Sequence, residues 1–385
     1  MAITTEAWVL YPGEGSSPGH AELKRESFTF DDPTEEEVLV KPLYGCWEGN
    51  MGHAIERKPV DLCKLRNEPK VVMGNAGVVE VISVGAKVTT VKPGDKAIVF
   101  CNGQWDAFGY PQKIFGYDAA GSIGLLAKQT KLHQKQLIPI PVENRYDLKR
   151  WAAFSLRYIT AWSNWRLAFG MLRLQLTENE LPEPIVFGWG GGVTLAELHL
   201  ARLQGCKTYQ ISSTEERRFA AEKLGIHPID RNDFPALNYE EERYKSDKEY
   251  RERYKASEVA FLKQVQEITE GQGVHIFLDY VGSPVIRATL KALSREGVVA
   301  TAGWKEGMQL WFLRAIECIE RHQFVHTHYA RYSEGVQAVR FALANEWLPE
   351  VDDRVYTFDE IPTLGRDYLG GDFTYFPIFE INSPS

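Results

Sequence analysis

The chain has 385 residues, of which 44% are hydrophobic and 25% are charged, and its formal net charge is −8 at pH 7. This length suits two domains around two cores, and the composition is that of an ordinary globular protein. The acidic balance argues against a nucleic-acid partner, because nucleic-acid binders neutralise phosphates with Lys and Arg. An acidic net charge is still compatible with a local basic pocket for a cofactor phosphate.

The sequence shows no targeting or membrane signal. The first residues lack a basic stretch followed by an apolar one, and no run approaches the roughly 18 apolar residues that span a bilayer. The five cysteines are scattered and never form a CxxC pair, which is typical of reduced thiols. We therefore expect a cytoplasmic protein with no membrane partner.

Residues 1–150 predict short strands with tight turns. Residues 37–43 and 78–84 alternate between apolar and polar side chains, and residues 91–100 place a Pro-Gly turn before an apolar strand. This pattern is typical of a small barrel or open sheet.

From about residue 150 strands alternate with helices. Helical spacing covers residues 148–169, apolar strands are expected at 184–188, 207–212, 274–279 and 297–303, and helices are expected at 194–203 and 215–224. Alternation of this kind indicates βαβ units and a parallel sheet, so the predicted fold class is α/β.

A charged, Tyr-rich segment at about residues 232–255 interrupts this alternation. We interpret it as a solvated, partly helical surface insertion. A role in a substrate entrance or a subunit contact is the alternative.

A glycine cluster lies between the first apolar strand and the helix after it. Its sequence is Gly188-Trp-Gly190-Gly191-Gly192-Val193-Thr194. Positions without side chains let a backbone approach a pyrophosphate, and a helix N-terminus supplies amide groups and a favourable dipole. The cluster predicts a dinucleotide site, although a tight strand–helix turn also favours glycine.

The end of the second strand distinguishes NAD from NADP. An NAD site usually carries an acidic residue there, whereas this strand ends at Ser212-Ser213, followed by Glu215-Glu216 and Arg217-Arg218. Two hydroxyls and nearby guanidinium groups suit a 2′-phosphate, so Ser212, Ser213 and Arg217 favour NADPH. The alternative is that Ser212 only caps the next helix and the arginines are solvated.

Several motifs resemble those of the medium-chain dehydrogenase/reductase superfamily. They are Gly77-Val-Val-Glu-Val-Ile-Ser-Val-Gly85 with Val91-Lys-Pro-Gly-Asp-Lys-Ala, then Thr160-Ala161-Trp162, and Asp279-Tyr-Val-Gly282-Ser. The resemblance implies a GroES-like catalytic domain at residues 1–155 and 323–385 and a Rossmann NADP-binding domain at 156–322. It also implies a homodimer or dimer of dimers, and it adds Thr160, Gly282 and Gly303 to the cofactor-binding candidates.

Within the superfamily the chain most resembles the crotonyl-CoA carboxylase/reductase group of 2-enoyl-thioester reductases. The motifs that carry this resemblance are Ile229-Asp-Arg-Asn232, His328-Tyr-Ala-Arg-Tyr-Ser-Glu, Phe115-Gly-Tyr117-Asp118 and Ser212-Ser213. The group uses a Phe-Glu pair where this chain has Tyr117-Asp118, and Asp is one methylene shorter. We therefore expect simple reduction more than reductive carboxylation.

Two further departures concern the cofactor. Superfamily members usually carry a last glycine where this chain has Thr194, which crowds the start of the helix. The family's Asn near the nicotinamide falls at Trp47, Gly49 or Asn50, depending on the alignment.

The residues of the zinc-dependent members are replaced. Trp47 stands where those members have a zinc-binding cysteine, and Val72-Met73-Gly74 stands where they have Gly-His-Glu. Of the four-cysteine structural lobe, only Cys101 lies in the corresponding region. We expect no metal site.

Hydride addition to an α,β-unsaturated thioester needs an oxyanion-binding donor and a proton source rather than a Lewis acid. The candidates are His328, Asp118, Tyr117 and Tyr158, and His326 is an alternative to His328. Two other functions stay open: a quinone, ketone or enone reductase of the same superfamily, and a member without redox turnover that acts as a scaffold.

Overall fold

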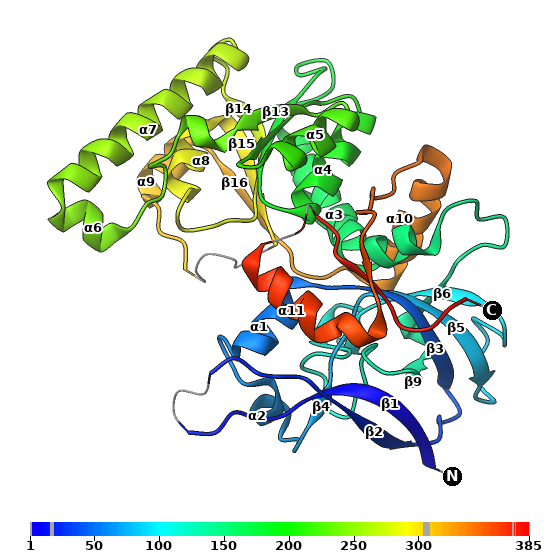
Figure 1. Cartoon of the computed structure of the whole chain (residues 1–385). Helices are drawn as coiled ribbons and strands as arrows, with labels where there is room; N and C mark the ends of the chain where they lie inside the picture. Colours follow the sequence, from blue (N-terminus) through cyan, green and yellow to red (C-terminus); the bar gives the residue numbers. More distant parts are fainter. Residues whose placement is uncertain (1, 16–18, 303–308, 372, 374, 385) are drawn as a thin grey trace. The chain divides into compact units, whose positions relative to one another are not determined.

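The computed structural model describes residues 2–15, 19–302, 309–371, 373 and 375–384. The chain divides into two compact units, one formed by Met1–Ile159 with Ala330–Ser385 and one formed by Thr160–Tyr329. The helix α3 (Leu148–Gln175) runs from the first unit into the second (Figure 1). No helix among the described residues is both long and apolar enough to cross a membrane.

The first unit is rich in β-structure. One sheet has the order β2-β1-β4, and within the described residues a second sheet of seven strands has the order β10-β6-β5-β3-β18-β17, with β9 beside β3. The strands of these sheets are β1 (Ala2–Leu10), β2 (Lys24–Asp31), β3 (Glu37–Cys46), β4 (Val71–Val72), β5 (Gly77–Val84), β6 (Lys96–Val99), β9 (Thr130–His133), β10 (Leu137–Pro139), β17 (Val355–Tyr356) and β18 (Ile378–Glu380). The strands β7 (Asn102–Trp105) and β8 (Pro111–Ile114) form a separate pair.

The expected strands form where the sequence alternates. Val79 and Val81 of β5 are buried in a core that includes Val38 and Val40 of the antiparallel neighbour β3. The Pro-Gly turn before β6 places Gly94 at φ +87°, a left-handed conformation that glycine adopts without strain. The short helices α1 (Gly49–Glu56), α2 (Leu62–Arg66), α10 (Tyr332–Asn345) and α11 (Ile361–Gly370) complete this unit.

The second unit contains a parallel sheet. Among the described residues its six strands have the order β13-β12-β11-β14-β15-β16, and every neighbouring pair is parallel. They are β11 (Ile185–Trp189), β12 (Lys207–Ser212), β13 (His227–Asp230), β14 (Val274–Asp279), β15 (Leu293–Thr301) and β16 (Gln323–His326). In chain order this is the 3-2-1-4-5-6 arrangement of dinucleotide-binding sheets, so the predicted parallel sheet is confirmed.

The second boundary lies later than the sequence suggested. We expected residue 323 to begin the returning segment of the first domain, but β16 pairs in parallel with β15. The first unit resumes only at Ala330. A four-residue strand with polar ends gives a weak sequence signal, so its pairing was not foreseen.

Helices accompany the parallel sheet and include the charged insertion. They are α4 (Gly192–Leu203), α5 (Glu215–Lys223), α6 (Glu241–Ser246), α7 (Lys248–Ile268), α8 (Ile286–Ala292) and α9 (Arg314–Glu320). The insertion is helical as expected, but several of its tyrosines turn inward. Tyr239, Tyr244 and Tyr254 form an aromatic cluster with centroid distances of 5.1 to 5.6 Å. Arg287 of α8 lies 5.0 Å from the rings of both Tyr239 and Tyr244.

Candidate dinucleotide site

The carboxyl ends of the parallel strands bring most of the predicted cofactor residues to one edge of the second unit. The glycine turn follows β11, Ser212 ends β12, and Gly282 lies just after β14. Strand order reverses between β12-β11 and β14-β15, and the crevice at such a switch point is where open α/β sheets bind ligands. His328 follows β16 at the same edge.

The glycine turn has the conformation that a backbone cradle requires. Gly190 has φ +137°, and Gly191 is the N-cap of α4, which begins at Gly192. A Cβ atom added to Gly191 would meet nothing within 4 Å, so one face of the turn is open. The first amide groups of α4 have no partners within the helix and are available to an anion there.

Thr194 is accommodated inside the turn. Its side chain is fully buried, and its hydroxyl donates a hydrogen bond to the carbonyl of Trp189 at 3.0 Å. A Cβ atom on Gly190 would come within 2.4 Å of the Thr194 hydroxyl oxygen. The residue that departs from the family pattern therefore packs behind the glycines rather than at the open face of Gly191.

The turn after β14 is held by a buried carboxylate. Oδ1 of Asp279 accepts hydrogen bonds from the backbone amides of Val281 (3.1 Å) and Gly282 (2.8 Å). Its Oδ2 accepts from the hydroxyl of Thr289 at 2.8 Å, and that hydroxyl accepts from the indole of Trp189 at 2.8 Å. Burial raises the pKa of Asp279 to about 6, although these hydrogen bonds act to lower it. The network joins the turn after β14 to the residue that precedes Gly190.

The end of β12 offers hydroxyls and a guanidinium. The Ser212 side chain is buried, and in the described part of the chain its hydroxyl has no hydrogen-bond partner. Ser213 is exposed and Arg217 is half-buried on α5. Arg218, which the sequence analysis did not select, donates to the Ser212 carbonyl at 3.3 Å and pairs with Asp230 at 3.0 Å.

Thr214 rather than Ser212 caps the next helix. Its side chain accepts from the backbone amide of Arg217 at 3.4 Å. The alternative role that we considered for Ser212, a helix cap, is therefore wrong. A bound ribose or phosphate oxygen would supply the hydrogen-bond partner that the buried Ser212 hydroxyl lacks in the described chain.

His328 is oriented by a backbone carbonyl. Its Nδ1 lies 3.0 Å from the carbonyl oxygen of Ala302, and its ring lies 4.2 Å from that of Tyr329. A carbonyl oxygen can only accept, so this hydrogen bond assigns the proton to Nδ1 and leaves Nε2 as the nitrogen presented to a ligand. His326 lies within β16 with its ring stacked 6.2 Å from Phe324. Thr160 is buried in α3, and Gly303 lies outside the described residues.

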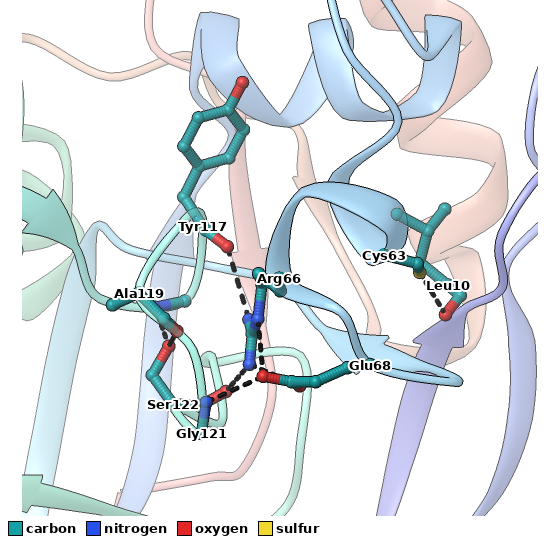
Figure 2. A network of polar contacts seen from close by, with 9 residues as sticks. Leu10, Cys63, Arg66, Glu68, Tyr117, Ala119, Gly121 and Ser122 are labelled. Atoms are coloured by element: carbon teal, nitrogen blue, oxygen red, sulfur yellow. Dashed lines mark hydrogen bonds and ion pairs between the residues drawn. The ribbon is translucent and has the colours of Figure 1, made fainter.

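Tyr117 and Asp118 lie in a loop of the first unit that Arg66 holds (Figure 2). The Arg66 guanidinium donates to the carbonyls of Tyr117 (3.2 Å) and Ser122 (2.7 Å) and pairs with Glu68 at 2.8 Å. The Tyr117 ring points away from this network, and burial raises the pKa of its phenol to about 12. Oδ1 of Asp118 accepts a hydrogen bond from the backbone amide of Ile114 at 2.6 Å, so this carboxylate takes part in the turn after β8.

Tyr158 does not fit the role of proton source. It is fully buried in the first unit, with ring centroids of Trp347 at 4.8 Å and Phe154 at 5.3 Å. The same burial raises the pKa of its hydroxyl. We correct this assignment, because helical spacing alone cannot separate a core aromatic from one that faces a site.

Trp47 and Met73, which the sequence resemblance placed where zinc-dependent members carry ligands, are fully buried. Among the described residues no three His, Cys, Asp or Glu side chains converge in a way that could hold a metal ion. Two buried polar groupings were not foreseen from the sequence: a pair between Glu48 and Arg157, and a network around Asn164 and Glu197. Their members are far apart in the chain, so no local pattern indicates them.

Comparisons with known proteins agree with this arrangement. A family model described as zinc-binding dehydrogenase matches residues 192–340. Crotonyl-CoA reductase of Streptomyces avermitilis is 23% identical over 80% of this chain and 67% of its own length, and crotonyl-CoA carboxylase/reductase of Cereibacter sphaeroides is 23% identical over 79% and 70%. These matches support the resemblance to the medium-chain dehydrogenase/reductase superfamily that the sequence motifs carry.

Solved structures show the same fold. The crotonyl-CoA carboxylase/reductase AntE in complex with NADP aligns with a TM-score of 0.81, at 20% identity, over 99% of this chain and 96% of that chain. The 2-octenoyl-CoA carboxylase reductase CinF, in complex with NADP and 2-octenoyl-CoA, aligns with a TM-score of 0.79, at 18% identity, over 99% and 88%. The expected combination of a GroES-like domain and a Rossmann domain is therefore confirmed.

Proposed function

We propose that this chain is an NADPH-dependent reductase of the medium-chain dehydrogenase/reductase superfamily and that it adds hydride to an α,β-unsaturated acyl thioester. The observation that carries the proposal is the open glycine turn at the switch point, next to a second strand that ends at Ser212, with Ser213 after it and no carboxylate at either position. The similarity to enzymes named crotonyl-CoA reductase supports the thioester substrate class.

The residues present fit NADPH. The backbone of Gly190, Gly191, Gly192 and Val193 would hold the pyrophosphate at the start of α4. The hydroxyls of Ser212 and Ser213 and the guanidinium of Arg217 would hold the 2′-phosphate. Arg218 adds a positive charge beside the Ser212 carbonyl, although Asp230 partly neutralises it.

When bound, NADPH supplies the hydride that reduces the C3 position of the enoyl group. The chain then has to stabilise the negative charge on the thioester oxygen and deliver a proton to C2. We assign the proton delivery to His328 or to a water that it orients, because the Ala302 carbonyl fixes its ring and leaves Nε2 for the ligand. Asp118 is engaged with the Ile114 amide, which supports simple reduction more than reductive carboxylation.

The cofactor assignment can be tested by titrating the protein with NADPH and with NADH, following the fluorescence of its ten tryptophans. We expect tighter binding of NADPH, and we expect Ser212→Ala combined with Arg217→Ala to lose about 10-fold or more of that preference. Ser246→Ala combined with Arg243→Ala, on the exposed helix α6, is the matched control. An unchanged preference in the first variant would remove the phosphate assignment.

The substrate class can be tested with crotonyl-CoA and longer 2-enoyl-CoA esters, with and without bicarbonate. We expect NADPH oxidation that saturates with the CoA ester, does not need bicarbonate and falls strongly in His328→Ala. Turnover of quinones or cyclic enones without any dependence on CoA would favour the other reductases of the superfamily. Absence of binding of either nicotinamide cofactor would favour a scaffold protein.

We further propose that the second unit forms a homodimer. Within the described chain β16 is an edge strand that pairs only with β15, and such edges are sites of strand pairing. Trp311 is 77% exposed and Ile319 is 64% exposed, and Trp311 lines a surface cavity of about 1260 Å³. A second copy would cover this apolar surface. Light scattering should give twice the chain mass, and Trp311→Glu combined with Ile319→Glu should give a monomer.

A further inference from the structure

Four buried or half-buried side chains from four separate segments meet in the second unit. Nδ2 of Asn164, on α3, donates to Oε1 of Glu197, on α4, at 3.0 Å and to the hydroxyl of Tyr280 at 2.7 Å. Oδ1 of Asn164 accepts from the hydroxyl of Thr327 at 2.9 Å. The Tyr280 hydroxyl in turn donates to Oε1 of Glu197. Asn164 therefore contacts all three of the other residues, and its two amide hydrogens are both used.

Two branches of this network reach the glycine turn. A Cβ atom on Gly190 would lie 2.9 Å from the Cβ of Tyr280, so the tyrosine packs directly against the turn. The backbone amide of Tyr280 also donates to the Trp189 carbonyl at 3.2 Å. Glu197 belongs to α4, the helix that the turn begins.

The third branch reaches the loop of the proposed acid. Thr327 immediately precedes His328 and follows β16. The Thr327 hydroxyl links this loop to Asn164 through its hydrogen bond to Oδ1. His328 itself contacts the Ala302 carbonyl. Removing the Thr327 hydroxyl would release this loop from α3 without touching the glycine turn.

The network is compatible with a neutral Glu197. The side chain is fully buried, and among the described residues it forms no ion pair, so burial raises its pKa to about 8. Hydrogen bonds inside a buried region are directional and costly to leave unmade, which makes a fully connected set a good means of fixing distances. Of the side-chain polar atoms of these four residues, Oε2 of Glu197 is buried without a hydrogen-bond partner in the described part of the chain.

We propose that Asn164, Glu197, Tyr280 and Thr327 are positioning residues that hold the glycine turn and the His328 loop at a fixed separation for hydride transfer and protonation. This inference rests on the proposed function. It assigns the Tyr280 and Glu197 branches to cofactor affinity and the Thr327 branch to turnover. Substitutions in the first two branches should therefore change NADPH binding, and substitution of Thr327 should change kcat.

The test uses three conservative variants of the full chain, with NADPH and the 2-enoyl-CoA ester that gives the highest turnover. Tyr280→Phe removes one hydroxyl and should weaken NADPH binding about 3- to 10-fold. Thr327→Val keeps the side-chain shape and should lower kcat about 3- to 10-fold with NADPH affinity unchanged. Tyr254→Phe removes another buried tyrosine hydroxyl, bonded to Glu258 at 3.1 Å, and should change neither quantity.

The outcomes are distinguishable. If the wild-type chain binds NADPH but Tyr280→Phe binds it equally well, the positioning role is overturned and the proposed function stands. If Tyr254→Phe and Tyr280→Phe lose affinity equally, the effect is general destabilisation and the inference also fails. If the wild-type chain binds no nicotinamide cofactor, the proposed function itself fails and the inference fails with it.

Discussion

The methyl group of Thr194 faces the backbone of Gly188. A Cβ atom added to Gly188 would lie 2.4 Å from Cγ2 of Thr194, closer than real side-chain atoms approach. The glycine at the end of β11 is thus required by the threonine at the start of α4. In the usual family pattern a glycine on the helix allows the close approach, whereas here the strand glycine makes room for a helix side chain.

This relationship predicts a compensating pair of substitutions. Gly188→Ala should lower the free energy of unfolding by about 1–3 kcal/mol, because the added methyl group overlaps Thr194. The same change in a Thr194→Ser background should cost clearly less, since serine keeps the hydroxyl that bonds Trp189 but lacks Cγ2. Chemical denaturation of the four proteins gives the coupling energy directly.

Gly191→Ala is the matched control for that cycle, because its Cβ would enter open space. It should change stability little and instead weaken NADPH binding, since the methyl group would project from the open face of the turn. Equal costs of Gly188→Ala in both backgrounds would contradict the close contact.

Glu197 predicts a specific pH dependence of stability. Its pKa in the folded chain is about 8 instead of the ordinary 4.5 because the carboxyl is buried. Between these values the unfolded chain has released the proton that the folded chain keeps, so the free energy of unfolding falls as pH rises. The stabilisation is complete below the ordinary pKa and is lost above about pH 8, by an amount on the order of a few kcal/mol.

Glu197→Gln should remove this part of the pH dependence, because an amide does not ionise. The comparison is best made between pH 6 and pH 8, the range from the pKa of about 6 that burial gives Asp279 to the pKa of about 8 of Glu197. The informative quantity is the slope of unfolding free energy against pH. A slope that is the same in the variant and the wild type would show that Glu197 is already ionised throughout this range.

Local patterns were sufficient to predict the elements around the proposed cofactor site. The apolar run at β11, the glycines after it and the strand that ends at Ser212 are each continuous in sequence, and the two strands and the helix α4 form where these patterns predict them. The choice between Arg217 and Arg218 was different. Which arginine contacts the Ser212 carbonyl depends on where α5 begins. Thr214 caps that helix, and with this start Arg218 donates to the Ser212 carbonyl.

Contacts between distant segments could not be read from the sequence. Asn164 and Thr327 are 163 positions apart, and each is an unremarkable polar residue beside apolar neighbours. The same holds for Tyr158, whose aromatic surroundings come partly from Trp347. Burial among residues from several segments is decided by tertiary packing, which residue periodicity does not specify.

The contacts of Arg66 predict that the Tyr117 loop becomes less stable when this side chain is replaced (Figure 2). Its side chain is buried and bridges two loop carbonyls and Glu68. Arg66→Met should lower the free energy of unfolding by about 3 kcal/mol, because buried acceptors lose their donor and Glu68 loses its counter-charge. Arg66→Lys should recover only part of this, since an ammonium group cannot reproduce the planar fork.

Lys64→Met, on the same short helix but exposed, is the control and should be nearly neutral. Hydrogen exchange of the amides at residues 116–122 gives a local measure, because the loop should open more readily in Arg66→Met. Unchanged protection there would show that the loop is held by its own turns, including the bond from the Gly116 amide to the Ser122 hydroxyl at 3.0 Å.

The pair between Glu48 and Arg157 gives the last prediction. Nε of Arg157 lies 2.7 Å from Oε2 of Glu48, and Nη2 donates to the Trp47 carbonyl at 2.9 Å, all in the interior of the first unit. Burial raises the pKa of Glu48, and the Arg157 charge opposes that rise. Arg157→Leu should therefore destabilise the chain by about 3–5 kcal/mol, because it leaves a buried carboxylate without a counter-charge.

The pH dependence distinguishes this cause from simple loss of packing. Without Arg157 the pKa of Glu48 should rise further, so the variant should lose additional stability as pH increases above the ordinary carboxyl range, while the wild type loses less. Adding Glu48→Leu to Arg157→Leu should restore part of the stability and flatten the profile, since no charge remains to be buried. If the double variant is as unstable and as pH-sensitive as Arg157→Leu alone, the cost comes from the lost contacts of the guanidinium with backbone carbonyls and not from an isolated charge.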